Sequence, residues 1–329
     1  MDPLIQEYLR GKNLLITGAS GYLASNMAKF LQNIPCTLRR LTRNFTLPSL
    51  HGKAIIEDIQ GEISEVSVWN QAMQGIDIVF HFASQTNVYI ADKDPESDYQ
   101  ANVLPMVHML ETCKKIESYP DILFAGTSTQ TGLPQNLPVD EKVQDNPITI
   151  YDLHKLMAEN YLKCYTRMGI VRGVTLRLTN VYGPGPKSSG ENRGFLNAMI
   201  SRSLSGKSPT LYGDGKHIRD YIYIDDVLSA FLKATLNIPS LNQKHFVLGS
   251  GQGHSISEVL HHIADLVTLK LDKKINVKTI KPPEGLSPIE ERNFVADSKS
   301  FSRLTGWQPV NSLTEGIEKT IETFLREKQ

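Results

Sequence analysis

The sequence of 329 residues contains only three cysteines, Cys36, Cys113 and Cys164, which lie far apart and form no C-x-x-C pair. This spacing excludes a disulfide framework and a cysteine-based zinc site, and it indicates reduced thiols in a cytoplasmic protein. The neighbouring residues His261 and His262 would face different ways on a helix, so they do not form a metal-binding pair. We therefore expect no metal.

A net charge of one sign is also missing, because 35 Lys and Arg residues balance 35 Asp and Glu residues. Binding to nucleic acid or to an anionic membrane would favour a basic chain, so neither partner is expected. No apolar run approaches the roughly 18 residues that span a bilayer. The first residues, Met1–Glu7, lack the charged-then-apolar pattern of a signal peptide. We expect a cytoplasmic protein of one or two domains with a large core.

What the sequence does contain is an apolar run, Leu14–Thr17, that ends at Gly18 and Gly21 before an amphipathic stretch. This order predicts a buried strand, a tight turn and a helix. Gly18 would permit the turn, and Gly21 would let the backbone approach a phosphate without a Cβ clash. The free N–H groups at such a helix N-terminus favour a pyrophosphate. A strict G-x-G-x-x-G is absent, because Ala24 takes the third place, and the turn alone could be an ordinary strand-to-helix connection.

Further apolar segments alternate with helical ones along the first half of the chain. The pattern predicts strands at 36–43, 54–59, 76–84 and 121–128, and helical periodicity over 98–116. Alternation at this spacing indicates βαβ units. The predicted fold class is therefore α/β, with a doubly wound parallel sheet of the Rossmann type.

The second predicted strand ends in Thr42 and Arg43, where NAD-binding sheets commonly carry an acidic residue for the adenosine ribose. A guanidinium can hold a 2′-phosphate that a carboxylate would repel, so Arg43 favours NADP(H), with NAD as the alternative. Arg39, Arg40 and Arg43 could instead be solvated charges at a strand end.

Tyr151 and Lys155 are four residues apart at the start of a helical stretch, so both project from one face. A phenol of pKa about 10 is a poor acid or base at neutral pH. A neighbouring ammonium and a cationic nicotinamide would favour the phenolate and lower that pKa. Such a pair occurs by chance in many proteins, but here it follows a glycine turn and a strand that ends in the hydroxyls of Thr127 and Ser128.

Together these motifs resemble the extended short-chain dehydrogenase/reductases that act on nucleotide sugars, which form the NAD-dependent epimerase/dehydratase family. The resemblance covers nearly the whole chain. It is carried by residues 17–24, 81–83, 102–103, 151 with 155, 177–185, 213–215, 219–227 and 304–309.

The resemblance implies a catalytic set of Thr127, Tyr151 and Lys155. Thr127 would hold the sugar carbonyl or alcohol beside Tyr151, which exchanges the proton, and Lys155 would hold the ribose. The implied cofactor-binding residues are Gly18, Ser20, Gly21, Tyr22, Leu23, Arg43, Asp58, Ile59, Phe82, Ala83, Ser84, Asn102, Tyr151, Lys155 and Leu178.

The implied substrate-binding residues are Thr127, Asn180, Arg219 and Arg292, the last three as donors to the diphosphate of a nucleotide sugar. Two alternatives remain open for the arginines. Arg219 could form a structural ion pair with Asp220 or Asp225, and Arg292 lies among carboxylates. Trp307 is interpreted as a C-terminal core anchor and not as a substrate platform.

Departures from the family pattern indicate the reaction. Ser128 and Thr129 stand where dehydratases carry an Asp-Glu pair, and decarboxylases usually hold Glu in place of Thr129, so neither reaction is expected. Gln130-Thr131-Gly132 replaces the Val-Tyr-Gly of most epimerases and resembles 4-ketoreductases, as do residues 151–155, 171–178 and 192–195. We predict NADPH-dependent reduction of the 4-keto group of a nucleotide-activated 6-deoxyhexose. The alternatives are a C4 epimerase with tightly bound NAD and a non-catalytic nucleotide-sensing module.

The same resemblance implies a two-lobed organisation. We expect a dinucleotide-binding domain at 1–178, to which later segments near 219–248 return, and a smaller substrate-binding lobe formed mainly by 179–329. Loops at 132–148, 183–194 and 281–288 are long enough to be lids or substrate loops. Helices near 101–117 and 153–168 would form a four-helix homodimer interface, although their apolar faces could be covered within the monomer.

Overall fold

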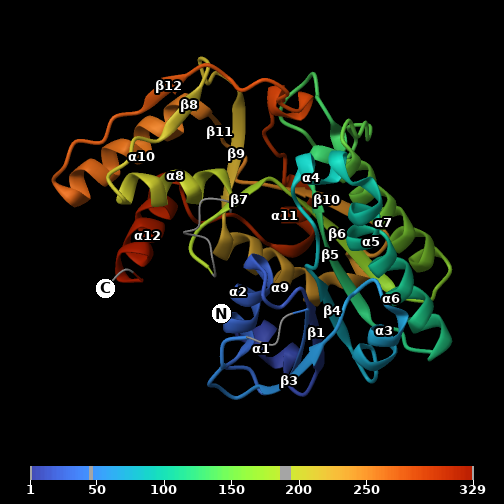
Figure 1. Ribbon diagram of the computed structural model, residues 1–329. Helices are drawn as coiled ribbons and strands as arrows, with labels where there is room; N and C mark the ends of the chain where they lie inside the picture. Colours follow the sequence, from blue (N-terminus) through green and yellow to red (C-terminus); the bar gives the residue numbers. More distant parts are fainter. Residues whose placement is uncertain (1, 44–46, 186–193, 328–329) are drawn as a thin grey trace.

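The computed structural model describes residues 2–43, 47–185 and 194–327. Within these residues seven strands form one sheet in the order β10-β6-β5-β4-β1-β2-β3, and all neighbouring strands are parallel (Figure 1). Their bounds are β1 (Asn13–Thr17), β2 (Thr37–Thr42), β3 (Ile55–Gln60), β4 (Ile78–His81), β5 (Asp121–Thr127), β6 (Arg172–Leu178) and β10 (His245–Leu248). The predicted doubly wound parallel sheet is confirmed.

Helices cover both faces of this sheet, as a parallel sheet requires. On one face lie α1 (Pro3–Leu9), α2 (Tyr22–Leu31) and α9 (Ile224–Leu241). On the other lie α3 (Val66–Ala72), α6 (Leu104–Lys115) and α7 (Ile150–Arg167), beside α4 (Val88–Lys93) and α5 (Pro95–Asn102) (Figure 1). Leu153 and Tyr161 of α7 are partly exposed, and the homodimer through these helices stays a prediction.

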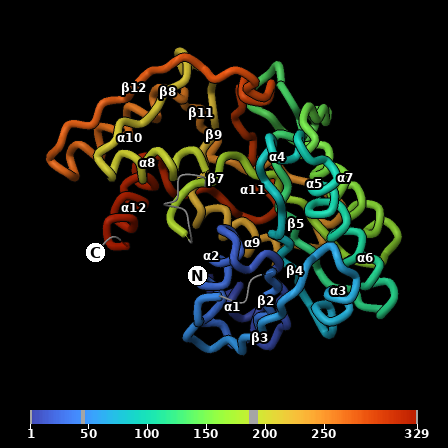
Figure 2. Tube along the Cα trace, viewed as in Figure 1, coloured from blue at the N-terminus to red at the C-terminus, as the bar shows by residue number. Residues whose placement is uncertain are grey.

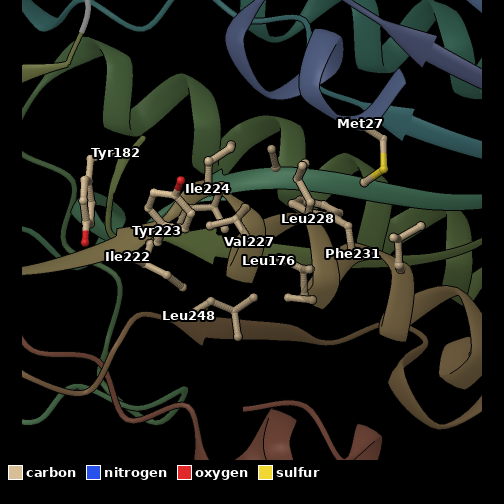
Figure 3. Packing of buried hydrophobic residues seen from close by; sticks show 14 of the residues in the cluster. Met27, Leu176, Tyr182, Ile222, Tyr223, Ile224, Val227, Leu228, Phe231 and Leu248 are labelled. Atoms are coloured by element: carbon tan, nitrogen blue, oxygen red, sulfur yellow. The ribbon is translucent and has the colours of Figure 1, made fainter. Parts of the chain in front are cut away.

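Alternation along each strand divides the core into two clusters. Leu14 and Ile16 of β1 belong to the cluster under α2 and α9, whereas Leu15 between them belongs to the cluster under α3, α6 and α7. Figure 3 shows Leu176 of β6 and Phe231 of α9 within the first cluster. The near-continuous apolar runs in the strands therefore reflect burial on both faces.

The predicted single helix over 98–116 is wrong, because two helices, α5 and α6, occupy this stretch and are interrupted at Val103. Pro105 lies in the first turn of α6. Proline has no backbone N–H to donate to Ala101, and its ring crowds that carbonyl, so a continuous helix is disfavoured.

The second lobe is built from short strands and three long helices. β11 (Gly253–Ser255), β9 (Ile218–Tyr223) and β7 (Asn180–Tyr182) form one small sheet, and β12 (Lys278–Ile280) pairs with β8 (Thr210–Tyr212). Together with α8 (Phe195–Leu204), α10 (Ile256–Leu271) and α12 (Leu313–Arg326) they form the upper left part of Figure 2.

The last part of the chain returns to α9. The Trp307 indole is buried and donates hydrogen bonds to the Asp226 carbonyl oxygen (3.0 Å) and to the Ser229 hydroxyl (2.9 Å). Trp307 is therefore a core anchor, as predicted. None of the helices described here is both long and apolar enough to cross a membrane.

Candidate active site

The carboxyl ends of β1 and β4 are neighbours at the point where the strand order reverses, and such switch points open a ligand crevice. The Thr17 hydroxyl oxygen ties the two ends together, because it accepts hydrogen bonds from the backbone N–H groups of Phe82 (3.1 Å) and Ala83 (3.0 Å). Sequence reasoning missed the role of Thr17. A polar residue that closes an apolar run was the available signal.

Both glycines of the turn are required by the backbone. Gly18 has φ +67°, and a Cβ there would lie 2.8 Å from the Ala83 Cα atom. Gly21 is the N-cap of α2, and a Cβ there would lie 2.9 Å from the Gly18 carbonyl oxygen. A cradle without side chains at a helix N-terminus fits the pyrophosphate of a dinucleotide.

A cavity of about 330 Å³ opens beside this turn. The predicted residues on its wall are Gly18, Gly21, Tyr22, Leu23, Phe82, Ser84, Thr127, Tyr151, Lys155 and Leu178. Ser20, Arg43, Asp58, Ile59, Ala83 and Asn102 do not line it. Residues that sequence reasoning missed include Thr86, Thr179, Val181 and Asn197. The predicted catalytic residues thus lie on the same wall as the glycine turn.

Tyr151 lies in the first turn of α7, which Thr149 caps by accepting a hydrogen bond from the backbone N–H of residue 152 (3.2 Å). The phenol lies near the hydroxyls of Thr127 and Ser84, which act to lower its pKa. Burial, assisted by the charges of nearby carboxylates, raises the pKa of Tyr151 above its usual range. The protein surroundings therefore raise the Tyr151 pKa, whereas the sequence predicted that it would be lowered. A bound cationic nicotinamide would have to lower it.

Lys155 lies one turn further along α7, and its Nζ atom is 4.1 Å from the centroid of the Phe124 ring. Burial lowers the pKa of Lys155 to about 7, although the carboxylates of Asp98 and Glu159 oppose this shift. A lysine with this pKa can change its protonation state near neutral pH, and hydrogen bonds to a ribose would favour the charged form.

Asn102, which was predicted to bind the cofactor, is buried and forms a hydrogen bond with the Ser84 hydroxyl. The Ser84 hydroxyl donates to Asn102 Oδ1 (2.6 Å), and Asn102 Nδ2 donates to Asp98 Oδ1 (3.0 Å). The other carboxylate oxygen of Asp98 lies 2.7 Å from His154 Nδ1. This network holds Ser84 against Tyr151.

The charged residues of β2 and β3 are paired across the two strands. Arg40 is buried, and its Nε and Nη2 atoms each donate to one oxygen of Asp58 at 2.7 Å. Arg39 Nε donates to Glu57 (2.8 Å). The alternative that Arg39 and Arg40 are solvated charges is therefore wrong, and Asp58 is engaged by a guanidinium.

Arg43 is the charge at the end of β2 that faces solvent. Its side chain is 75% exposed and lies 3.9 Å from the Glu62 carboxylate. The adjacent Thr42 hydroxyl donates to the Ser20 hydroxyl (3.3 Å), so the end of β2 lies beside the glycine turn. A role for Arg43 in cofactor binding stays a prediction.

A second cavity, of about 570 Å³, is lined by the other predicted substrate residues, Asn180, Arg219 and Arg292. The two cavities adjoin, because Val181 and Gly194 line the first whereas their chain neighbours Asn180 and Phe195 line the second. Residues 192–193, which contributed to the resemblance, lie outside the described residues.

Two guanidinium groups give this second cavity its charge. Arg219 is only 4% exposed, and its Nη2 atom lies 3.7 Å from the Glu290 carboxylate. Burial, together with the charge of Arg292, lowers the pKa of Arg219 to about 10. Asp220 instead accepts hydrogen bonds from the backbone of residues 250, 251 and 296, so it is not the partner of Arg219.

Arg292 follows the short helix η2 (Pro288–Glu291) and faces the same cavity. Its Nη2 atom donates to Asn180 Oδ1 (3.4 Å), whereas its Nε atom is buried and has no hydrogen-bond partner among the described residues. Two neighbouring guanidinium groups, one of them buried, suit a ligand that carries more than one negative charge, although the Glu290 and Glu291 carboxylates also line the cavity.

A comparison with protein families agrees with this geometry. The family model that matches residues 14–249 describes the NAD dependent epimerase/dehydratase family. The chain belongs to this family. It is an enzyme family, and the match spans the glycine turn, the catalytic set and the whole parallel sheet.

Similar members of the family are 4-epimerases. The chain is 29% identical to the putative UDP-glucose 4-epimerase of Methanocaldococcus jannaschii, over 94% of this chain and 97% of that protein. The structure resembles that of UDP-glucose 4-epimerase from Thermotoga maritima with UDP-glucose (TM-score 0.85, 25% identity, 96% of this chain and 100% of the other). It also resembles the UDP-glucose 4-epimerase of Thermus thermophilus in complex with NAD (TM-score 0.81, 26% identity, 95% and 99%).

These comparisons support the predicted family and nucleotide-sugar chemistry but not the predicted subfamily. They favour the epimerase alternative over 4-ketoreduction, and NAD over NADP(H). The structure explains why Gln130 is a poor guide to the subfamily. Gln130, read as a ketoreductase feature, is buried; its Oε1 atom accepts from the Thr127 backbone N–H (3.1 Å), and its Nε2 atom donates to Glu159 (3.1 Å).

Proposed function

We propose that the protein is a nucleotide-sugar 4-epimerase that acts on a UDP-hexose such as UDP-glucose and holds NAD. The carrying observation is the placement of the Tyr151 and Thr127 hydroxyls, in contact with each other, on the wall that also bears Gly18 and Gly21. The adjoining cavity, which Arg219 and Arg292 line, supports a diphosphate-linked substrate. The likeness to UDP-glucose 4-epimerases, one of them in complex with NAD, supports the choice of reaction and cofactor.

In this reaction Tyr151 takes the proton of the sugar 4-hydroxyl and later returns it, while Thr127 holds the same oxygen atom. Bound NAD supplies a reversible hydride acceptor. Lys155 holds the ribose, and its positive charge favours the phenolate form of Tyr151. Arg219 and Arg292 hold the diphosphate, so the sugar ring can present its second face without the nucleotide leaving the protein.

Purification without added cofactor tests this function. The protein is expected to release NAD on denaturation, identified by chromatography, and to interconvert UDP-glucose and UDP-galactose without net consumption of cofactor. A ketoreductase exchanges its cofactor in every turnover. Oxidation of NADPH in the presence of a nucleotide-linked 4-keto sugar, with no interconversion of UDP-hexoses, would overturn the proposal.

Arg292→Ala is expected to raise KM for UDP-glucose by about 10- to 100-fold, with a smaller change in kcat, because a charge-assisted hydrogen bond contributes about 1.5–3 kcal/mol. Arg292 is preferred to Arg219 for this test, since Arg219 donates to three carbonyl oxygens, those of Ile218, Glu290 and Arg292, whereas Arg292 donates to one, that of Ile289 (3.0 Å). Arg303→Ala, an exposed cation on α11 (Lys299–Thr305), is the matched control and should leave KM unchanged. An unaltered KM in Arg292→Ala would exclude a diphosphate contact.

A further inference from the structure

A carboxyl group that the proposed reaction does not use lies immediately after Tyr151. Asp152 is completely buried, and its Oδ1 atom accepts a hydrogen bond from the Thr129 hydroxyl. The other oxygen, Oδ2, is buried and has no hydrogen-bond partner among the described residues. Burial raises the pKa of Asp152 to about 6, although the hydrogen bond from Thr129 and the nearby Thr149 hydroxyl oppose the shift. A buried carboxyl in this position needs an explanation.

The Asp152 carboxyl is connected to the catalytic set through two hydroxyls. Thr129 Oγ1 lies 2.8 Å from Thr127 Oγ1, and the Thr127 hydroxyl lies near the Tyr151 phenol. Thr127 and Thr129 belong to the end of β5 and to the short helix η1 (Ser128–Thr131), whereas Asp152 belongs to α7. We call the series Asp152–Thr129–Thr127–Tyr151 the hydroxyl relay.

The direction of each bond in the relay follows from counting protons. A threonine hydroxyl has one proton to donate, and an ionised carboxylate can only accept. Thr129 donates its proton to Asp152, so Thr127 must be the donor in the bond between the two threonines. The Thr127 oxygen is then left as an acceptor, which it already is for the backbone N–H of Thr129 (3.3 Å).

We propose that Asp152 is a positioning residue whose carboxylate, through the Thr129 hydroxyl, fixes the Thr127 hydroxyl as a hydrogen-bond acceptor at the reacting oxygen atoms. This inference rests on the proposed function. A sugar alcohol offers a proton to Thr127, whereas a 4-keto sugar needs a donor. An ionised Asp152 therefore favours binding of the alcohol and its oxidation.

When Asp152 is protonated, the hydrogen bonds of the hydroxyl relay reverse their direction, and no covalent bond within the relay is broken. The carboxyl group, after taking a proton from hydronium in the solvent and leaving water, donates to Thr129, which then donates to Thr127, and the Thr127 proton becomes available to a ketone oxygen. The state of Asp152 thus sets which half of an epimerisation Thr127 assists.

The charge of Asp152 is influenced by groups on several elements. Arg292 lowers the pKa of Asp152 and Asp92 of α4 raises it. An anionic diphosphate beside Arg292 would offset the first effect, so substrate binding should raise this pKa further. Other titratable groups lie on the helices packed at this end of α7. They are Tyr151, Lys155 and His154 of α7, the last paired with Asp98 of α5, then Glu96 and Tyr99 of α5, and Tyr89 and Lys93 of α4.

Titration of Tyr151 in the NAD-bound protein tests the relay without requiring turnover. Phenolate absorbance is recorded against pH and corrected with Tyr151→Phe, which isolates Tyr151 from the other tyrosines. Thr129→Val frees the Thr127 proton to hydrogen-bond the phenolate, so the Tyr151 pKa should fall by about one unit. Thr129→Ser keeps the hydroxyl and should match the wild type.

Thr131→Val is the matched control. Thr131 is a buried threonine of the same short helix, and its hydroxyl donates to the Ser128 carbonyl oxygen (3.0 Å), outside the relay. It should leave the Tyr151 titration unchanged. The inference is overturned if Thr129→Val leaves the titration at its wild-type position, or if Thr131→Val shifts it equally.

Turnover supplies a second readout. The pH profile of UDP-glucose oxidation by the wild type should show an ionisation near the pKa of Asp152. Thr129→Val and Asp152→Asn should lose this ionisation while their KM stays unchanged.

If the Tyr151 titration shifts as expected but no UDP-hexose is epimerised, the proposed function alone fails. If epimerisation occurs and the titration does not shift, the role of Asp152 alone fails. A wild type that does not bind NAD would overturn both.

Discussion

Tyr151→Phe is expected to lower kcat for UDP-glucose epimerisation by about 10²- to 10⁴-fold, the range that a positioned general acid–base contributes. The substitution removes only the oxygen atom that contacts Thr127 and Ser84 on the cavity wall. KM should change little, because the diphosphate is held in the adjoining cavity by Arg219 and Arg292.

Bound NAD and the thermal unfolding midpoint should stay near wild-type values in Tyr151→Phe, since the ring and its packing remain. Tyr161→Phe removes a phenol oxygen from the same helix at a partly exposed position and serves as the control. Steady-state kinetics on both variants give the comparison. Activity close to wild type in Tyr151→Phe would contradict the assignment of Tyr151 as the proton-transferring group.

Arg177→Met is expected to destabilise the protein by about 3–5 kcal/mol, the cost of breaking a buried ion pair from one side. Arg177 of β6 is 1% exposed, and it donates to Glu159 through Nε (2.9 Å) and Nη2 (2.7 Å). Its Nη2 atom also donates to Asp145 (2.9 Å). Glu159 is completely buried on α7, one turn after Lys155. Loss of the guanidinium removes two of the donors to this carboxylate and leaves Lys163 Nζ (2.5 Å) and Gln130 Nε2 (3.1 Å) as the remaining ones.

The direction in which the stability of wild type and Arg177→Met depends on pH follows from the Glu159 pKa. Burial opposes the ionisation of Glu159, but hydrogen bonds and charge from Arg177 outweigh it and lower the pKa of Glu159 to about 2. In the wild type this contribution to stability is present above the unfolded-state pKa and is lost as the pH falls towards 2. In Arg177→Met only Lys163 and His245 are left to oppose burial, so the Glu159 pKa rises and the carboxylate takes up a proton at a higher pH than in the wild type.

The stability gap between wild type and Arg177→Met should therefore narrow from neutral to mildly acidic pH, as measured by urea unfolding at both. Arg167→Met, at the exposed end of α7, is the control and should differ from wild type by less than about 1 kcal/mol. A gap that stays constant with pH would show that the loss does not come from an uncompensated Glu159. Because Gln130 connects Glu159 to the Thr127 backbone, activity should also fall.

Residues that are close in the chain allowed the fold and the core of the site to be predicted. The turn at Gly18 and Gly21, the alternation that gives a parallel sheet, and the pairing of Tyr151 with Lys155 depend on backbone geometry within a few residues. The break between α5 and α6 was missed, although Pro105 provided the signal.

The reaction was harder to predict because it depends on contacts between distant segments. Gln130 and Thr129 were interpreted as marks of a subfamily, yet Gln130 holds Thr127 and Glu159 in place, and Thr129 bonds Asp152, which is 23 residues away. A side chain's neighbours across elements cannot be read from its place in one motif. The comparisons with 4-epimerases corrected that interpretation.

The sequence by itself determined the α/β class, the glycine turn and the placement of Tyr151 and Lys155 on one helix face, because strand periodicity, positive φ and helical spacing are local properties. Only the tertiary structure decided the partners of the charges. Arg40 forms an ion pair with Asp58 because β2 and β3 pair in the register that places these two residues opposite each other. The Arg219 guanidinium donates to the carbonyl oxygen of Arg292, which is 73 residues away. Register and packing set these contacts, and no single segment contains that information.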